Sequence, residues 1–169
     1  MKALGALTII GSCLGLSLTA IRSVKNRIRS MFWLCRAVEM IRAELSSRMS
    51  PLPELMRLAA DRSEGECRAF FEKVGAFFDE PTDELFPERW EKSARSCLPS
   101  LRESERRELI LLGQCIGRYE IHEQLASCDR FLASVSAAHD GELSRFSNNR
   151  RVFLALGTAA GAFLCLILL

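Results

Sequence analysis

Residues 3–21 read ALGALTIIGSCLGLSLTAI and residues 152–169 read VFLALGTAAGAFLCLILL, and neither stretch contains a charged side chain. A helix rises about 1.5 Å per residue, so stretches of this length can cross a hydrocarbon core of about 30 Å. Nearly all charged residues lie in the roughly 130 residues between the two stretches, enough for one small domain. The sequence therefore predicts transmembrane helices at residues 3–21 and 152–169, with one polar domain at residues 22–151 between them.

The basic residues beside the two stretches predict which side of the membrane the domain faces. Lys2 is the only basic residue between either apolar stretch and the nearer chain terminus, which we call the outer side. Seven others crowd the inner flanks, namely Arg22, Lys25, Arg27, Arg29, Arg145, Arg150 and Arg151. Because Lys and Arg near transmembrane helices accumulate on the cytoplasmic side, we expect a two-span protein of the cell membrane. Its middle domain is then cytoplasmic and both termini lie outside.

The first stretch also has a second interpretation. Residues 1–21 can be taken as a cleaved secretory signal, or residues 10–13 (IGSC) as a lipoprotein cleavage box. The remaining chain is then a secreted or lipid-anchored helical binding module. Residues 14–18 stay largely apolar where a polar tether normally follows a lipidated cysteine, and the dense positive charge after Ile21 opposes export. We therefore favour a retained transmembrane helix.

The middle segment has the residue spacing of helices and few strand signals. Apolar residues recur every three or four positions from Met31 to Leu45, the pattern of a helix with one buried face, which we expect to begin near Ser23 and end near Ser47. Ser50 and Pro51 are interpreted as the N-cap and first residue of a short second helix. A third helix at about 66–78, a fourth that opens at Trp90 and stops before Pro99, and a fifth that carries Leu109 to Ile116 complete the set. We predict an all-α fold, a cytoplasmic antiparallel helical bundle flanked by the transmembrane helices.

Aromatic residues are expected to anchor the core of this bundle. Residues 70–78 contain four phenylalanines, and aromatic side chains dominate core packing. Helical spacing turns Phe70 and Phe77 toward one face, and the Trp90 indole is too large to leave in water without a reason. We expect all three side chains to be buried.

The segment that follows residue 120 has nearly heptad spacing. Steps of 4-3-4-3-4-4-3 separate Ile121, Leu125, Cys128, Leu132, Val135, His139, Leu143 and Phe146. Since no proline follows Pro99, we expect one helix from about Glu120 into the second apolar stretch, on the order of 70 Å long. This seam is interpreted as packing within the domain's own bundle, and self-association into a homo-oligomer is the alternative.

The sequence lacks the motifs of common catalytic and cofactor sites. It has no Gly-rich phosphate loop, no Gly-x-Ser-x-Gly, no His-Glu-x-x-His and no acidic calcium loop. Glu103, Glu105 and Glu108 alternate with arginines and are interpreted as a solvated face of i,i+3 and i,i+4 pairs. Seven cysteines without a Cys-x-x-Cys suit a reducing cytoplasm. We expect no enzymatic activity, no cofactor, no metal and no nucleic-acid partner.

Each apolar stretch contains a pair of glycines one helical turn apart. These pairs are Gly11 with Gly15, and Gly157 with Gly161. Small residues at this spacing let helix backbones approach closely within lipid. We interpret the glycines as packing surfaces of the transmembrane helices, against the alternative that they are ordinary glycines of membrane-spanning segments.

Residues 43–45 (AEL) are followed by Ser50, Pro51 and Leu52, and residues 90–94 (WEKSA) come after them. This acidic, apolar, then Thr/Ser-Pro-Leu pattern resembles the stage III sporulation protein AB family of endospore-forming bacteria. The strongest likeness lies in residues 101–124, where family positions are held by Leu101, Glu105, Gly113, Gly117 and Gln124. Glu120 stands where the family usually has Asp. The likeness runs from end to end of the chain.

The resemblance implies a function and partners. On this resemblance, the chain is related to the inner-membrane platform proteins of type II secretion and type IV pilus machines. It is then located in the mother-cell membrane around the forespore. The implied partners are the stage III sporulation protein AA, a secretion-type ATPase, and other membrane subunits of the same complex. The turn that contains Gly113, Gly117, Glu120 and Gln124 is then either a structural cap or a joint that couples the ATPase to the membrane assembly.

Overall fold

The computed structural model describes the backbone of residues 2–47, 50–79, 83–118 and 120–168, and the side chains of those among them from 22 to 144. Six α-helices and one short 3-10 helix make up this part of the chain. They are α1 (Lys2–Ser47), α2 (Leu52–Asp61), α3 (Gly65–Gly75), η1 (Ala76–Phe78), α4 (Phe86–Cys97), α5 (Glu103–Cys115) and α6 (Ile121–Leu168). No strand occurs within these ranges, so the all-α prediction is confirmed.

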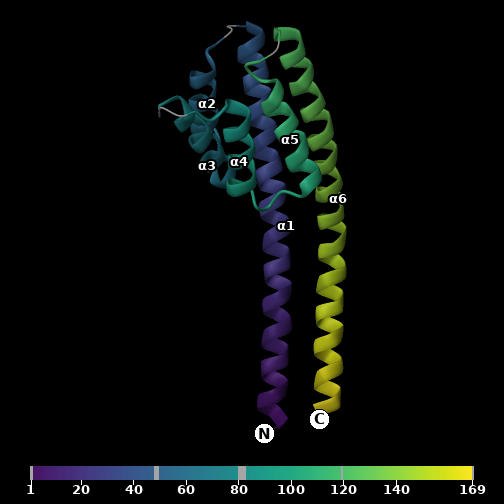
Figure 1. The fold of residues 1–169 in the computed structure, drawn as a ribbon. Helices are drawn as coiled ribbons and strands as arrows, with labels where there is room; N and C mark the ends of the chain where they lie inside the picture. The colour runs from purple at the N-terminus through teal and green to yellow at the C-terminus, as the bar shows by residue number, and fades with distance from the viewer. Residues whose placement is uncertain (1, 48–49, 80–82, 119, 169) are drawn as a thin grey trace.

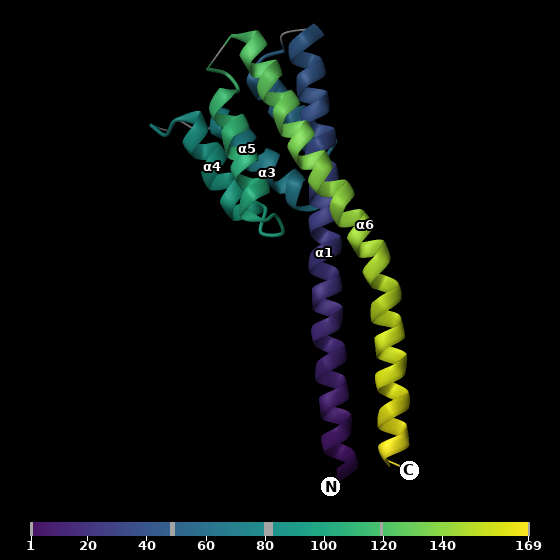
Figure 2. The same cartoon turned by 90° about the vertical axis from the view of Figure 1, so that its right-hand side faces the viewer.

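Helices α1 and α6 are the longest elements and run antiparallel, side by side (Figure 1). Helices α2 to α5 pack beside one half of this pair and complete the bundle, as the view in Figure 2 also shows. Both chain termini lie at the opposite end of the pair. We call the end where α1 meets α2 and α5 meets α6 the distal end, and the end where α1 and α6 leave the bundle the proximal end.

Neither long helix is interrupted where the sequence changes from polar to apolar. The predicted unbroken C-terminal helix is confirmed, because the 48 residues of α6 run without a stop and give about 72 Å at 1.5 Å per residue. The sequence placed the start of the first polar helix near Ser23, whereas α1 already runs from Lys2 through this point.

The predicted transmembrane helices are not tested by this structure. Where side chains are described, no helix is both long and apolar enough to cross a membrane. The stretches 3–21 and 152–169 lie outside those residues, and with them the glycine pairs Gly11, Gly15, Gly157 and Gly161.

The core of the bundle is aromatic, as predicted, but its membership differs. Phe70 and Trp90 are fully buried, with ring centroids 5.0 Å apart in an edge-on arrangement. The prediction that Phe77 is buried is wrong, because its side chain stays partly exposed against Phe78 and Phe86. Helix α3 ends at Gly75 and tightens into η1, so the 3.6-residue period on which the prediction depended stops before Phe77.

Two predicted helix starts also shift. Helix α2 begins at Leu52, with Pro51 at its N-cap and no side-chain cap. The Ser50 hydroxyl instead donates a 3.3 Å hydrogen bond to a carboxylate oxygen of Glu44, so the predicted Ser50 cap is wrong. Helix α4 begins at Phe86, before Trp90, because Pro87 fits the first turn of a helix.

The seam of α6 packs within its own bundle. Cys128 and Val135 are buried, Leu125 and Leu132 are half-buried, and α6 lies against both α1 and α5. Leu143, near the proximal end, is 42% exposed. Packing within the domain's own bundle therefore accounts for the seam from Leu125 to Val135, but not for Leu143.

Candidate functional site

Most of the predicted family-motif residues lie at the distal end, where the α1–α2 and α5–α6 connections meet. Leu52 begins α2, and Gly117 lies in the turn between α5 and α6. A Cβ atom added to Gly117 would lie 3.0 Å from Leu52 Cδ2, so the two connections are in contact. Ser50 and Pro51 immediately precede Leu52. The structure thus brings two distant parts of the family motif together, and we call this arrangement the distal joint.

The turn at Gly117 depends on a backbone conformation that favours glycine. Its φ angle is +78°, in the left-handed region where a Cβ atom is disfavoured. Its backbone N–H donates a 3.2 Å hydrogen bond to Gln124 Oε1, on the first turn of α6. Gly117 therefore permits the backbone turn, and the side chain of Gln124 stabilises it by this hydrogen bond.

Glu120 occupies the N-terminal boundary of α6. Its carbonyl oxygen accepts hydrogen bonds from the backbone N–H groups of Glu123 at 3.0 Å and Gln124 at 3.1 Å. The carboxylate is exposed at the positive end of the helix dipole, which favours a negative charge. The backbone makes both of these bonds, so they do not require the Asp that the family usually has here.

Gly113 lies apart from the joint, in the core. A Cβ atom there would lie 2.2 Å from Trp90 Cδ1, far inside contact distance. Trp90 Nε1 also donates a 2.8 Å hydrogen bond to the Leu109 carbonyl oxygen, one turn earlier on α5. Gly113 therefore permits the close packing of α4 on α5 and takes no part in the surface of the distal joint.

A second cluster, which the sequence did not predict, lies at the proximal end. Arg27 of α1 donates through Nε to both carboxylate oxygens of Glu105 on α5, at 3.1 and 3.0 Å. Its Nη1 lies 3.0 Å from Glu142 Oε1 on α6, and Arg102 Nη1 lies 3.1 Å from the same oxygen. The side chains of Arg27, Glu105 and Glu142 are at most 10% exposed. We call these four residues the proximal ion cluster.

The placement of Glu105 corrects a sequence-based expectation. Glu103 is exposed and pairs with Arg106 at 2.9 Å, as the solvated-face interpretation predicts. Glu105, by contrast, is buried against Arg27, and it also accepts a 2.9 Å hydrogen bond from the Arg102 backbone N–H. The sequence does indicate that Arg27 is buried, because Arg27 precedes Met31 by four residues and so continues the buried face of α1, but it does not indicate that Glu105 is its partner.

The proximal ion cluster ties three helices together with balanced charge. Its two arginines offset its two glutamates, and the hydrogen bond to Glu105 is the main reason that the pKa of Arg27 is raised above its usual value. Breaking a buried pair of this kind by removing one partner costs about 3–5 kcal/mol. The cluster therefore fixes α1 and α6 to α5 at the level where both long helices leave the bundle.

Metal ligands and disulfides are two further kinds of candidate feature in the part of the chain that the structure describes. Within it, no three His, Cys, Asp or Glu side chains are placed to hold a metal ion. The cysteines described, at positions 35, 67, 97, 115 and 128, are all free thiols.

Comparison with known proteins identifies the family of this chain. A family model described as stage III sporulation protein AB matches residues 2–169, nearly the whole chain. The chain therefore belongs to the stage III sporulation protein AB family, and this membership implies a role in sporulation. The resemblance drawn from the sequence motifs is thus confirmed.

A solved structure described as stage III sporulation protein AB has the same fold. It matches with a TM-score of 0.64 and 18% sequence identity, over 72% of this chain and 97% of that one. Comparison with curated protein sequences gave no match.

Proposed function

We propose that this chain is a non-enzymatic platform subunit of a membrane complex needed for endospore formation, located in the mother-cell membrane around the forespore. The observation that carries the proposal is the course of α1 and α6. The two helices leave the bundle at the same end, side by side, and each continues into an uncharged stretch of 18 or 19 residues (Figure 1). A pair of spans with one domain between them is the form that a membrane platform requires.

The charges at the proximal end support a cytoplasmic domain. Arg22 and Lys25 are exposed on α1 beside the apolar stretch, where the positive-inside rule favours basic side chains. Arg27 contributes little to this flank, because Glu105 and Glu142 neutralise it inside the bundle.

We also propose that the two glycine pairs form packing surfaces within the bilayer for other membrane subunits of the complex. These pairs are Gly11 with Gly15, and Gly157 with Gly161.

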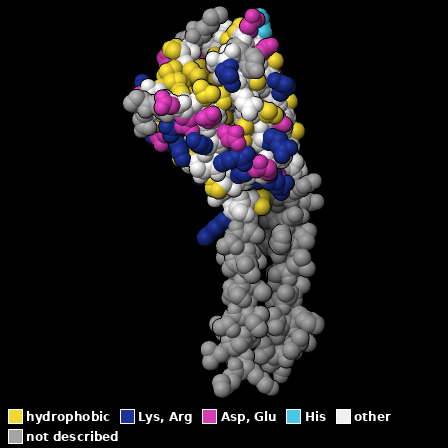
Figure 3. Space-filling view, viewed as in Figure 1, with side chains coloured by type: hydrophobic (Ala, Val, Ile, Leu, Met, Phe, Trp, Pro, Cys, Tyr) yellow, Lys and Arg dark blue, Asp and Glu magenta, His cyan; other side chains and the backbone are white. Residues whose placement is uncertain are grey.

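The distal end is the surface that we propose for docking of the secretion-type ATPase, the stage III sporulation protein AA. It lies farthest from the chain termini and so projects farthest into the cytoplasm on this topology. Hydrophobic side chains gather near it on the face shown in Figure 3. Leu85, just before α4, is 59% exposed. Exposed apolar patches of this kind mark interaction sites.

Two features support transmission of motion from the distal end to the membrane. The distal joint begins α6, so any displacement of Glu120 or Gln124 acts on the helix that leads to the second apolar stretch. The proximal ion cluster then couples α6 to α1 through Arg27 and Glu142. On this proposal, ATPase engagement at one end moves both long helices together at the other.

A binding measurement tests ATPase docking. The full chain, reconstituted in lipid nanodiscs, is titrated with the purified ATPase, and folding of each variant is checked by circular dichroism. We expect Glu120→Lys to weaken binding at least tenfold. The matched control Asp61→Lys, an exposed charge reversal at the other end of α2, should bind like the unmodified chain. No binding by the unmodified chain, or equal binding by both variants, would contradict the docking surface.

A further inference from the structure

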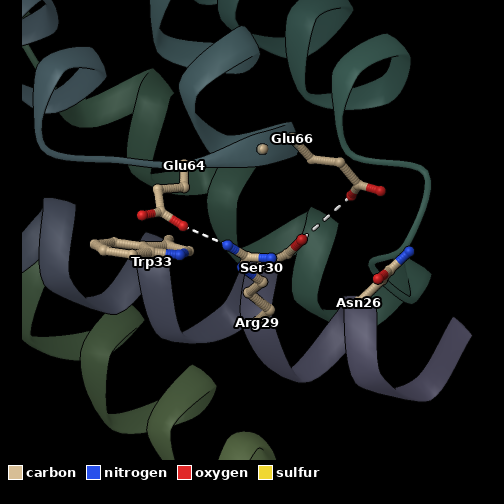
Figure 4. Close-up of a pocket in the computed structure, with 7 residues that line it drawn as sticks. Asn26, Arg29, Ser30, Trp33, Glu64 and Glu66 are labelled. Atoms are coloured by element: carbon tan, nitrogen blue, oxygen red, sulfur yellow. Dashed lines mark hydrogen bonds and ion pairs between the residues drawn. The ribbon is translucent and has the colours of Figure 1, made fainter. Parts of the chain in front are cut away.

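A pocket between α1 and the α2–α3 connection has a polar lining that the platform role leaves unexplained (Figure 4). One face of α1 supplies Asn26, Arg29 and Trp33, and the opposite wall carries Glu64 and Glu66. The pocket volume of about 180 Å³ corresponds to about six water molecules at roughly 30 Å³ each. It therefore suits a small polar group and is too small for a nucleotide or a folded peptide.

Glu66 combines fixed geometry with spare hydrogen-bonding capacity. Its Oε2 atom accepts a 3.2 Å hydrogen bond from the Ser30 hydroxyl, a 3.4 Å bond from the Ser100 backbone N–H, and a bond from the Ser100 hydroxyl. Its Oε1 atom has no hydrogen-bond partner among the residues that the structure describes. Three donors thus hold the carboxylate in place while one oxygen remains available to a ligand.

The charges around the pocket select the ligand. Arg29 forms an exposed ion pair with Glu64 through Nη2, and its other guanidinium N–H groups are available for an anion. With Glu66 included, the lining carries one positive and two negative charges. A purely anionic group is therefore disfavoured, and a group that combines an ammonium with a phosphate matches both signs.

We propose that this pocket binds the headgroup of phosphatidylethanolamine, with the ammonium at the Glu66 carboxylate and the phosphate at Arg29 and Asn26. The inference rests on the proposed two-span function, because α1 runs unbroken from Lys2 to Ser47 and Asn26 follows the first apolar stretch by five residues. At 1.5 Å per residue, Asn26 lies about 8 Å and Arg29 about 12 Å beyond the hydrocarbon. The headgroup layer extends roughly 5–8 Å per leaflet, so Asn26 lies at its outer edge and a bound headgroup reaches outward from there to Arg29 and Glu66.

The chemistry predicts a preference among lipids. A primary ammonium has three N–H donors, whereas the quaternary ammonium of phosphatidylcholine has none for the Glu66 oxygen. A hydrogen bond to a charged group changes a binding constant by roughly tenfold to a hundredfold. Phosphatidylglycerol carries a net negative charge without an ammonium, so the acidic lining disfavours it.

Native mass spectrometry of the full chain in mild detergent tests the proposal. The chain is offered equal amounts of phosphatidylethanolamine, phosphatidylcholine and phosphatidylglycerol, and circular dichroism checks the folding of every variant. We expect at least tenfold more phosphatidylethanolamine than phosphatidylcholine to be retained. Glu66→Gln and Arg29→Gln should each remove most of this preference. The matched control Arg36→Gln, two turns further along α1 and outside this pocket, should retain it.

Four results would overturn the proposal. One is equal retention of phosphatidylethanolamine and phosphatidylcholine, and another is a preference that survives both pocket variants. The third is binding of soluble phosphoethanolamine as tight as that of the lipid, and the fourth is carbodiimide cross-linking of Glu66 to a lysine of another subunit. Either of the last two assigns the pocket to a different ligand. Membrane topology is measured separately by cysteine labelling. A cytoplasmic domain without lipid preference would therefore refute this pocket and leave the platform function standing.

Discussion

Arg27 on α1 and Glu105 on α5 form an ion pair that is almost completely shielded from water, with side chains 7% and 5% exposed. The two residues lie far apart in the sequence, and Glu142 from α6 completes the coordination of the guanidinium. Arg27, Glu105 and Glu142 thus connect three helices. Two of them, α1 and α6, lead to the termini, and the third, α5, leads to the distal joint.

Removing either partner of this pair should destabilise the bundle strongly. Arg27→Gln leaves the buried Glu105 carboxylate without a charged partner, and Glu105→Gln leaves the buried cluster with an excess positive charge. Breaking a buried pair in this way costs about 3–5 kcal/mol. Denaturant unfolding of the full chain in detergent, followed by tryptophan fluorescence, measures the change. The matched control is Arg68→Gln, which breaks the exposed i,i+4 pair with Glu72 and should cost much less. Comparable losses for the buried and the exposed pair would contradict the assignment.

Gly113 and Gly141 allow the same substitution to be tested in opposite environments. At Gly113 a Cβ atom would lie 2.2 Å from Trp90 Cδ1, whereas at Gly141 nothing lies within 4 Å. Gly113→Ala should therefore destabilise the bundle by about 1–3 kcal/mol through overpacking. Gly141→Ala, within α6, should be neutral or stabilise it by up to about 1 kcal/mol. Equal effects in the same unfolding assay would mean that α4 and α5 do not cross this closely.

The buried thiols predict loss of stability at high pH. Burial raises the pKa of Cys67 from 9.0 to about 12, and that of Cys128 to about 11. Because the folded state holds these protons more tightly, their contribution to stability is complete below about pH 9 and is lost as pH rises toward 11–12. The melting temperature of the unmodified chain should fall over this range.

A double variant isolates the thiol contribution from other groups that titrate at high pH. Cys67→Val combined with Cys128→Val should show a shallower fall in melting temperature between pH 9 and pH 11 than the unmodified chain. Identical slopes would show that these thiols do not ionise on unfolding.

The sequence predicted those parts of the fold that local spacing and proline positions determine. The end of α1 at Ser47, the stop of α4 before Pro99 and the unbroken course of α6 agree with the structure. The error at Phe77 has a local cause, because the change from α-helix to 3-10 helix after Gly75 leaves no clear mark in the spacing.

The candidate site was only partly predictable, because its parts come together through tertiary packing. The family motif identified Leu52, Gly117 and Gln124, but their contact across two connections follows only from the bundle. Arg27 was counted among the membrane-flanking charges, since nothing near it in the sequence reveals a partner on α5. Long-range ion pairs of this kind have no local sequence signal.

The central claim, a cytoplasmic domain held by two membrane spans, is tested most directly by cysteine labelling of intact cells with a membrane-impermeant maleimide. The native thiol of Cys67 is a poor reporter because it is buried and has a raised pKa. A cysteine introduced by Ser104→Cys, at an exposed position on α5, reports on the domain, and a cysteine added after Leu169 reports on the C-terminus. The unmodified chain gives the background of its own thiols. We predict labelling of the added C-terminal cysteine in intact cells, and labelling of Ser104→Cys only after permeabilisation. Labelling of Ser104→Cys in intact cells would contradict the platform function and support the secreted or lipid-anchored module.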